Sequence, residues 1–417
     1  MITYYNRDGQ EIDKERLIRE GFKFNEERDF RKKYNIDKNT GEKKDSYTYV
    51  LDFVGFLINS NNDIFAVFPK NYRIINPNAD SSKIFSVIAK HIQQRPDMYL
   101  GNEYGNNLKS NYPFAAFFGV YDYFTKYGLY FDDMIFIKPN AGGKINWKNT
   151  IRFSNKYITH NKLVFFPIYY EKKYYFLNFL TECMIYAIDY TIDKFGIFIG
   201  LDKTGRVFPT FDFINQKEFV LESLISLQQQ IFKDSVLDLI EHLINFFNFL
   251  NEGGVYYLKH YSFNTIWEDM VMNYLKFNYK EVNDNQIVFD ENDSRHITFT
   301  KPSFHPNLAK TEQFFTSDYY YADGDTQLIF DAKYYTEIQG IDYKQIAYFL
   351  FLNELRENIG DNEPKYNKTY SALLIPSESR SSQIHFQMDP RFNKTNKNLV
   401  ISEEYLDIRE VIEFYLK

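Results

Sequence analysis

The sequence has 417 residues and a formal net charge of −7, and 19% of its residues are Phe, Trp or Tyr. This length allows two or three domains that each have a hydrophobic core. The single cysteine, Cys183, excludes a disulfide framework and a cysteine-based zinc site.

Charge is distributed unevenly along the chain. Residues 1–254 contain 32 Lys and Arg against 31 Asp and Glu (+1), and residues 255–417 contain 17 against 25 (−8), which together give −7. This balance argues against a protein whose affinity depends mainly on nucleic-acid phosphates. A DNA partner would need a local basic surface in the first part, or a second protein.

Targeting and membrane signals are not seen in the sequence. The first residues, "MITYYNRDGQ", have neither the basic start nor the apolar run of a signal peptide. Apolar stretches such as "HLINFFNFL" are too short to cross a bilayer. We therefore predict a cytoplasmic protein that has no membrane contact.

The first half of the chain mixes strands and a helix. Residues 49–72 predict two strands joined by the turn-forming loop "NSNND", and residues 81–94 predict a helix. Further alternating runs at residues 162–170 and 196–202 predict strands. We expect residues 1–215 to form a strand-rich region that binds DNA or a partner.

Two predicted segments follow this region. Residues 216–252 have apolar side chains at helical spacing and end at a Gly pair, which indicates a helical connector. Residues 253–417 then predict one α/β domain, whose elements follow in chain order. They are a helix (264–277), a hairpin-like strand pair (286–302), a second hairpin (317–335), a helix (341–358), two strands (369–378 and 382–389) and a helix (405–417).

The second hairpin carries charges within an apolar strand. Alternate residues of a strand share a face, so Asp331 and Lys333 point one way while Leu328 and Phe330 point the other. Charges in such a strand are unfavourable unless they are paired or bind an ion. An ordinary ion pair on a solvated strand face is the alternative to a functional site.

The turn of this hairpin predicts which residues face Asp331. "DG" is typical of a two-residue hairpin loop. If Asp323 and Gly324 form the loop, Ala322 pairs with Asp325, and Asp318 lies opposite Ile329 and diagonal to Asp331. Diagonal neighbours lie about 7–8 Å apart, so two carboxylates can meet at one ion. Asp323 and Asp325 are the substitutes for Asp318 if the register differs.

Two converging carboxylates raise each other's pKa unless a cation lies between them. Hard oxygen ligands favour Mg²⁺ or Mn²⁺ over zinc. Such an ion lowers the pKa of water and stabilises charge on a phosphate, and Lys333 would orient the water or stabilise the transition state. The predicted chemistry is metal-dependent phosphodiester hydrolysis.

The pattern Asp-x(12)-Asp-Ala-Lys, with "LIFDAKYY", resembles the PD-(D/E)XK nuclease superfamily and in particular its McrC and LlaJI branch. The segment "FVGFL…IFAVFPK" resembles an early segment of that branch more weakly. The residue before Asp318 is Ser317, where the superfamily has proline. The resemblance implies a mixed central sheet flanked by helices.

The resemblance also implies the roles of individual residues. Asp318 and Asp331 would bind Mg²⁺ (or Mn²⁺), Glu268 of a preceding helix would assist at the metal, and Lys333 would be catalytic. Gln345, in a helix that continues to Tyr348, matches the superfamily's Gln-x-x-Tyr pattern and would support the site.

The expected function is that of a DNA endonuclease of a restriction or phage-defence system. The sequence contains no G-x-x-x-x-G-K-[ST] motif, and members of the McrC branch work beside a separate McrB-like AAA+ GTPase. The expected partners are therefore double-stranded DNA and such an ATPase or GTPase subunit, with a homo-oligomer as a further possibility. The alternatives are an autonomous type II restriction endonuclease and a non-catalytic scaffold with the nuclease fold.

Overall fold

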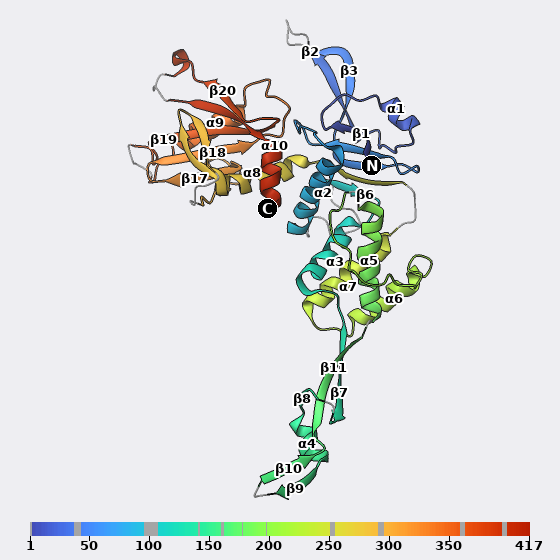
Figure 1. Ribbon diagram of the computed structural model, residues 1–417. Coiled ribbons are helices and arrows are strands. Elements are labelled where there is room, and N and C mark those ends of the chain that lie inside the picture. Colours follow the sequence, from blue (N-terminus) through green and yellow to red (C-terminus); the bar gives the residue numbers. More distant parts are fainter. Residues whose placement is uncertain are drawn as a thin grey trace. The chain divides into compact units, whose positions relative to one another are not determined.

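The computed structural model describes residues 2–36, 43–95, 107–140, 142–159, 162–176, 178–196, 198–250, 255–290, 296–358, 363–393 and 398–417. Packing divides the chain into two compact units. Unit 1 comprises Met1–Tyr112, Ile197–Ile199 and Gly253–Lys417, and unit 2 comprises Pro113–Gly196 and Gly200–Glu252. Helices and mixed sheets occur together (Figure 1), which confirms the α/β class. The functional division into residues 1–215, 216–252 and 253–417 stays a prediction, since the two units reflect packing alone.

The first sheet of unit 1 has five strands in the order β1-β5-β4-β12-β6. Their bounds are β1 (Ile2–Arg7), β5 (Ile64–Phe68), β4 (Val54–Ile58), β12 (Tyr256–His260) and β6 (Leu108–Ser110). β4 and β5 pair antiparallel, and every residue of both is buried. This pair, joined across the "NSNND" loop, confirms the strands predicted there.

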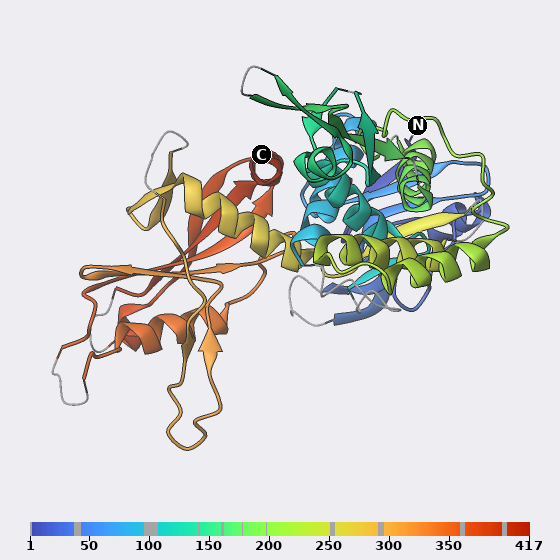
Figure 2. The same cartoon turned by 90° about the horizontal axis from the view of Figure 1, so that it is seen from below.

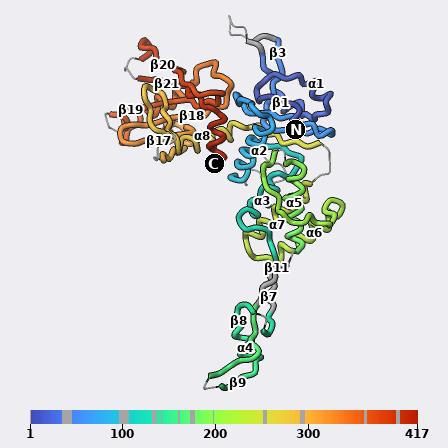
Figure 3. Tube along the Cα trace, viewed as in Figure 1, coloured from blue at the N-terminus to red at the C-terminus, as the bar shows by residue number. Residues whose placement is uncertain are grey.

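The chain leaves this first sheet after β6 and returns to it in β12 (Figure 3). Asn111 links the two points, because its Nδ2 donates to the Val255 carbonyl (2.8 Å) and its Oδ1 accepts from the Tyr257 N–H (2.8 Å). Phe198, from the short segment between the two parts of unit 2, stacks on Phe56 with 4.5 Å between ring centroids. The sheet is thus completed by residues far apart in the sequence.

Helices and a hairpin accompany the two sheets of unit 1. The helices are α1 (Lys14–Arg19), α2 (Pro77–Gln94), α8 (Phe263–Asn278), α9 (Tyr343–Asn353) and α10 (Ile408–Leu416), with a 3₁₀ turn at Pro390–Phe392. The hairpin pairs β2 (Phe30–Ile36) with β3 (Lys43–Leu51). α2 begins four residues before the predicted helix, because Asn76 caps it and Pro77 occupies its first turn.

The second sheet of unit 1 has the order β17-β18-β19-β21-β20. Its strands are β17 (Tyr319–Asp323), β18 (Thr326–Ala332), β19 (Lys368–Ser377), β21 (Val400–Asp407) and β20 (Ser381–Gln387). β18, β19 and β21 are parallel, and β17 and β20 are antiparallel edges. The residues of β18 between its two ends are all buried, as is typical of a central parallel strand.

α8 and α9 cover opposite faces of this second sheet (Figure 2). Ile329 of β18 packs against Tyr348 of α9 on one face. On the other face, the Trp267 indole of α8 donates to the Leu374 carbonyl of β19 (3.2 Å). α10 packs against α8. The helices predicted after residues 263 and 340 are confirmed, and the last predicted helix begins three residues later than expected because β21 includes its start.

Two short strand pairs complete unit 1. β13 (Tyr279–Asn283) pairs with β14 (Gln286–Phe289), and β15 (Ser303–Phe304) pairs with β16 (Phe315–Thr316). The prediction that residues 286–302 form their own hairpin is therefore wrong. β14 pairs instead with the preceding strand through Asp284 and Asn285, whose φ angles are 47° and 62°. Asp and Asn tolerate this left-handed region, which a two-residue hairpin loop requires.

Unit 2 is built on a group of helices. They are α3 (Phe114–Tyr127), α5 (Phe179–Phe195), α6 (Lys217–Gln228) and α7 (Asp234–Phe249). α7 packs against α3, α5 and α6. The helical character predicted for residues 216–252 is confirmed within residues 216–250, where it forms two helices that pack within this unit, and residues 251–252 lie outside the described part of the chain. The strand predicted at residues 196–202 is wrong for its described residues, 196 and 198–202, which form none.

An arm of strands, residues 132–176, connects α3 to α5 within unit 2 (Figure 1). It consists of β7 (Asp132–Pro139), β8 (Lys144–Ile145), α4 (Trp147–Phe153), β9 (Asn155–Thr159), β10 (Lys162–Phe166) and β11 (Tyr169–Phe176). Large apolar side chains are exposed on it, among them Trp147 (54%), Ile158 (82%) and Phe166 (57%). Residues 134–170 contain six Lys and Arg and no Asp or Glu.

Across the ranges given above, no helix is both long and apolar enough to cross a membrane.

Candidate active site

The hairpin β17–β18 differs from the predicted register by two residues. Ala322 pairs with Gln327 and Tyr320 with Ile329, so the loop is Gly324–Asp325 and the predicted pairing of Asp318 with Ile329 is wrong. Gly324 has a φ of 56° and takes the first central position, which a type II′ turn reserves for glycine. A two-residue shift keeps every side chain on its predicted face. Continued by one step, the observed register brings Asp318 directly opposite Asp331.

Asp318 lies immediately before β17, within reach of the end of β18. Its Oδ2 accepts a hydrogen bond from the Ala332 N–H (2.9 Å), which fixes the carboxylate beside the residue that follows Asp331. Its Oδ1 lies 3.6 Å from the Nζ of Lys301. Asp323 and Asp325, the substitutes considered for Asp318, lie at the far end of the hairpin.

Asp331 is a buried carboxylate with 2% of its surface exposed. Its Oδ2 lies 2.7 Å from the Nζ of Lys333. Its Oδ1 has no hydrogen-bond partner and lies 3.7 Å from the Nζ of Lys344. Burial, followed by the charge of Asp318, raises the pKa of Asp331 to about 6, although Lys333 opposes the shift. The pair is not the solvated ion pair that a bare D-x-K triplet predicts.

Lys333 lies between two carboxylates. Besides Asp331, its Nζ contacts the Oδ2 of Asp342 at 2.9 Å. Burial would lower the pKa of Lys333, but the charges and hydrogen bonds of these two acids raise it well above the ordinary lysine value. The ammonium is therefore held charged and oriented at the end of β18.

Asp342 is a site residue that sequence reasoning missed. It caps the N-terminus of α9, where its Oδ1 accepts from the Gln345 N–H (2.9 Å). An Asp three residues before a helical Gln is a recognisable capping signal. That signal predicts the cap alone, and only the packing of α9 on the sheet brings Asp342 to Lys333.

Glu268 of α8 is linked to Asp318 through Lys301. Its Oε2 lies 3.1 Å from the Nζ of Lys301, which also contacts Asp318, so one ammonium bridges two of the predicted metal ligands. Its backbone carbonyl accepts from the Tyr319 hydroxyl (2.8 Å). Burial, and then nearby acids, raise the pKa of Tyr319 well above its ordinary value. In decreasing order of effect these acids are Asp318, Glu268, Asp331 and Asp269.

Gln345 lies in the same neighbourhood, where its backbone N–H donates to Asp342 while its side chain bonds to the sheet. It is fully buried, and its Nε2 donates to the Ile329 carbonyl (2.9 Å) and to the Ser371 hydroxyl (2.8 Å). It therefore ties α9 to β18 and β19. This position is compatible with a supporting role, and its predicted contribution to catalysis stays a prediction.

The donor set suits a hard divalent cation. Asp318 and Asp331 offer carboxylate oxygens, and the Oδ1 of Asp331 is buried without a hydrogen-bond partner. Lysine ammonium groups lie against these acids, as expected where negative charge converges. Among the residues described, no three His, Cys, Asp or Glu side chains already form a metal-binding group. A cation here would thus use two or three carboxylates and water.

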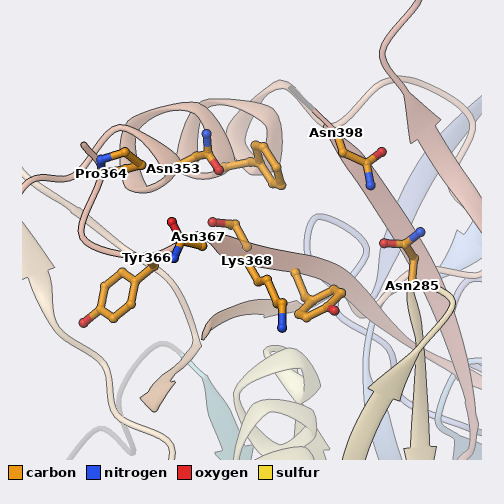
Figure 4. A pocket seen from close by; sticks show the side chains of 10 residues that line it. Asn285, Asn353, Pro364, Tyr366, Asn367, Lys368 and Asn398 are labelled. Atoms are coloured by element: carbon orange, nitrogen blue, oxygen red, sulfur yellow. The ribbon is translucent and has the colours of Figure 1, made fainter. Parts of the chain in front are cut away.

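A separate pocket of about 380 Å³ lies at the opposite end of the same strands (Figure 4). It is lined by Lys368 and Thr369 at the start of β19, and by amide side chains. The amides are Asn285, Asn353, Asn367 and Asn398. Among the described residues that line the pocket there is no carboxylate, whereas Asp331 and Lys333 lie at the carboxyl end of β18, where ligands of open α/β sheets usually bind. We therefore treat the acidic cluster as the candidate site.

Comparisons with known proteins give a weak structural likeness. No family model matches the chain, and no curated protein matches it. A solved structure described as the refined half-complex from the tetradecameric assembly of Thermococcus gammatolerans McrB AAA+ hexamers with bound McrC is 13% identical. The match covers 92% of this chain and 89% of that chain with a TM-score of 0.34. This score is too low to assign a fold, so the case for function depends on the site.

Proposed function

We propose that this chain is a metal-dependent endodeoxyribonuclease with the PD-(D/E)XK fold, and that it acts as the nuclease subunit of a restriction or phage-defence system. One observation carries the proposal. Asp318, Asp331 and Lys333 meet at the carboxyl end of a central parallel strand, and a buried oxygen of Asp331 has no hydrogen-bond partner.

In this proposal Asp318 and Asp331 hold Mg²⁺ or Mn²⁺, and Glu268 supports them from α8. The ion would supply Lewis acidity at the phosphate and a lowered pKa for water. The remaining work falls to residues of the chain. The Ala332 N–H orients Asp318, and the strand fixes the spacing between Asp331 and Lys333.

Lys333 contributes a fixed positive charge. Its pKa is raised by the two flanking acids, so it remains an ammonium at neutral pH. Such a group stabilises negative charge that develops on a phosphate, or orients the attacking water by hydrogen bonding. An ammonium that is already positioned loses little conformational entropy when DNA binds.

The proposal includes a separate AAA+ GTPase of the McrB type. Two observations support a partner of this kind. The chain has no phosphate-binding G-x-x-x-x-G-K-[ST] motif of its own. The arm of unit 2 exposes large apolar side chains, and its residues 134–170 contain six Lys and Arg and no Asp or Glu. Exposed apolar patches with a polar rim are typical of protein interaction surfaces.

The first prediction tests the catalytic assignment. Plasmid cleavage in Mg²⁺ is compared for wild type, Lys333→Ala and Lys368→Ala, each with and without an added AAA+ GTPase and GTP. Lys368 begins β19 and lies at the far end of the same sheet, so it is a matched control. Lys333→Ala should slow cleavage by roughly 100-fold or more, and Lys368→Ala should not.

The outcomes separate the possible functions. Equal cleavage by wild type and Lys333→Ala would contradict the assignment. Cleavage by the pure chain alone would favour an autonomous restriction enzyme. A chain that cleaves under none of these conditions, and whose Mn²⁺ binding is unchanged by Asp331→Asn, would be a scaffold.

A further inference from the structure

Lys333 is held by carboxylates from two different elements. Asp331 belongs to its own strand, whereas Asp342 begins α9, on the face of the sheet that carries the site. The two contacts have similar lengths, 2.7 Å and 2.9 Å. If Asp331 also ligates a cation, its charge is shared between that cation and Lys333. Asp342 is then the carboxylate that attracts Lys333 without also binding the cation.

Asp342 divides its interactions between two tasks. Its Oδ1 caps α9 by accepting from the Gln345 N–H, and its Oδ2 contacts Lys333. Burial would raise the pKa of Asp342, but hydrogen bonds from Lys333 and Gln345 lower it. The side chain is therefore ionised and fixed at both oxygens.

The backbone of Asp342 is fixed as well. Its N–H donates to the Nε2 of His385 on β20 at 3.1 Å. Because Nε2 accepts this hydrogen bond, the neutral ring carries its proton on Nδ1. Nδ1 lies 2.7 Å from the Oε1 of Glu403 on β21, and both side chains are 5% exposed.

Glu403 in turn is held by its neighbours. Its Oε2 accepts from the Gln383 amide and from the Tyr405 hydroxyl, each at 2.5 Å. Burial would raise the pKa of Glu403, but these hydrogen bonds lower it. A continuous series of contacts therefore runs from the edge of the sheet through Glu403, His385 and Asp342 to Lys333.

We propose that Asp342 is the positioning residue for Lys333, and that His385 and Glu403 hold Asp342 in place. This inference rests on the proposed nuclease function, since it assigns Asp342 a part in the same site. Partners that orient functional groups in this way typically change activity by about 10- to 100-fold when they are removed. Asp342 acts through Lys333 and has no contact with the predicted metal ligands Asp318 or Glu268 among the interactions of the described residues.

The decisive variant is Asp342→Asn. Asparagine caps a helix as well as aspartate, so α9 keeps its start while the charge facing Lys333 is lost. The matched control is Asp407→Asn, because Asp407 caps α10 through the Arg409 N–H and ends β21, which is separated from β18 by β19. Thermal unfolding of both variants checks that the fold is kept.

Two measurements test the inference. With plasmid DNA, saturating Mg²⁺ and an added AAA+ GTPase with GTP, Asp342→Asn should lower kcat by about 10- to 100-fold with little change in KM, and Asp342→Glu should restore part of it. In metal-free protein, labelling of Lys333 by an amine-reactive reagent, followed by mass spectrometry, should be several-fold faster in Asp342→Asn. Asp407→Asn should match wild type in both.

The result that would overturn the inference is an Asp342→Asn protein with wild-type kcat and wild-type labelling of Lys333. If wild type cleaves no DNA, the proposed function fails, and the labelling alone decides whether Asp342 holds Lys333. A variant that loses activity but labels like wild type also overturns the positioning role.

Discussion

At the scale of residues, the candidate site concentrates opposite charges. Asp331 is paired with Lys333, and Lys301 bridges Glu268 and Asp318 at 3.1 Å and 3.6 Å. An ammonium placed between two carboxylates competes with any cation that uses the same oxygens. Lys301 is 43% exposed at its side chain, so solvent weakens this competition without removing it.

Removing Lys301 should therefore tighten metal binding. For Lys301→Met we expect the Kd for Mn²⁺, measured by titration calorimetry, to fall by about five-fold, which corresponds to ~1 kcal/mol. Lys310→Met, a change at an exposed lysine of the loop between β15 and β16, is the control. A Kd that stays the same or rises in Lys301→Met would show that Lys301 does not compete.

Sequence patterns predict part of this site for a simple reason. Asp331 and Lys333 alternate within one strand, and the period of a strand alone places them on one face. The turn predicts that Asp318 lies on the same face, and this prediction stays correct because the register differs by an even number of residues. Asp342, Lys301 and His385 reach the site through packing between separate elements, and no local pattern encodes that packing.

At the scale of elements, the turn of the β17–β18 hairpin sets the approach of Asp318. Its glycine has a φ of 56°, and a Cβ there would meet no atom within 4 Å. A substitution would thus be costly through backbone strain alone, since L-residues avoid this region. The conformation of this turn sets the pairing of β17 with β18, and that pairing places Asp318 near Asp331.

Gly324→Ala should lower the free energy of unfolding by about 1 to 2 kcal/mol, measured in urea. Gly340→Ala is the matched control, because a Cβ at Gly340 also meets no atom within 4 Å and its φ lies outside the left-handed region. The control should change the free energy by less than about 0.5 kcal/mol. Equal effects at the two glycines would mean that the strain at Gly324 is unimportant.

Individual elements were easier to predict than their pairing. Strands and helices follow from periodicity, so the hairpin at 317–335 and the helices α8 and α9 appear where the sequence predicts them. The order β17-β18-β19-β21-β20 depends on contacts between distant segments. The same limitation explains why β14 was predicted to pair with the segment after it and not with β13.

At the scale of the whole molecule, unit 1 connects its first sheet to the strand that carries the site. Lys70 follows β5. Its backbone N–H donates to the Tyr334 hydroxyl oxygen at 2.9 Å, and its Nζ donates to the Tyr334 carbonyl at 3.3 Å. Asp8, after β1, lies 3.6 Å from the same Nζ. Tyr334 directly follows Lys333, so these contacts connect the first sheet to the end of the strand that carries the candidate site.

Asp8 makes this connection dependent on pH. Burial raises its pKa from 3.8 to about 6, although Lys70 opposes the shift, and this difference corresponds to ~3 kcal/mol. A carboxyl group whose pKa is raised by folding binds more protons in the folded state between pH 4 and 6. Its contribution to stability is therefore present below pH 4 and is lost as the pH rises through 6.

Comparison with Asp8→Asn isolates this effect. Between pH 4 and pH 7, the free energy of unfolding of wild type should fall relative to the variant by up to ~3 kcal/mol, measured by urea unfolding at each pH. A difference between the two proteins that does not change with pH would contradict the raised pKa.

The junction between β6 and β12 has a consequence for how such a chain can be rearranged. Asn111 joins the Val255 and Tyr257 backbones, so the two points where the chain leaves and re-enters the first sheet are already neighbours. The intervening unit behaves as an insertion that evolution or a protein engineer can exchange without rewiring a strand. A deletion would remove from unit 1 the buried Phe198, whose ring stacks on Phe56, and the buried Ile199 beside it. A shortened chain made by closing this junction would need replacements for these buried side chains.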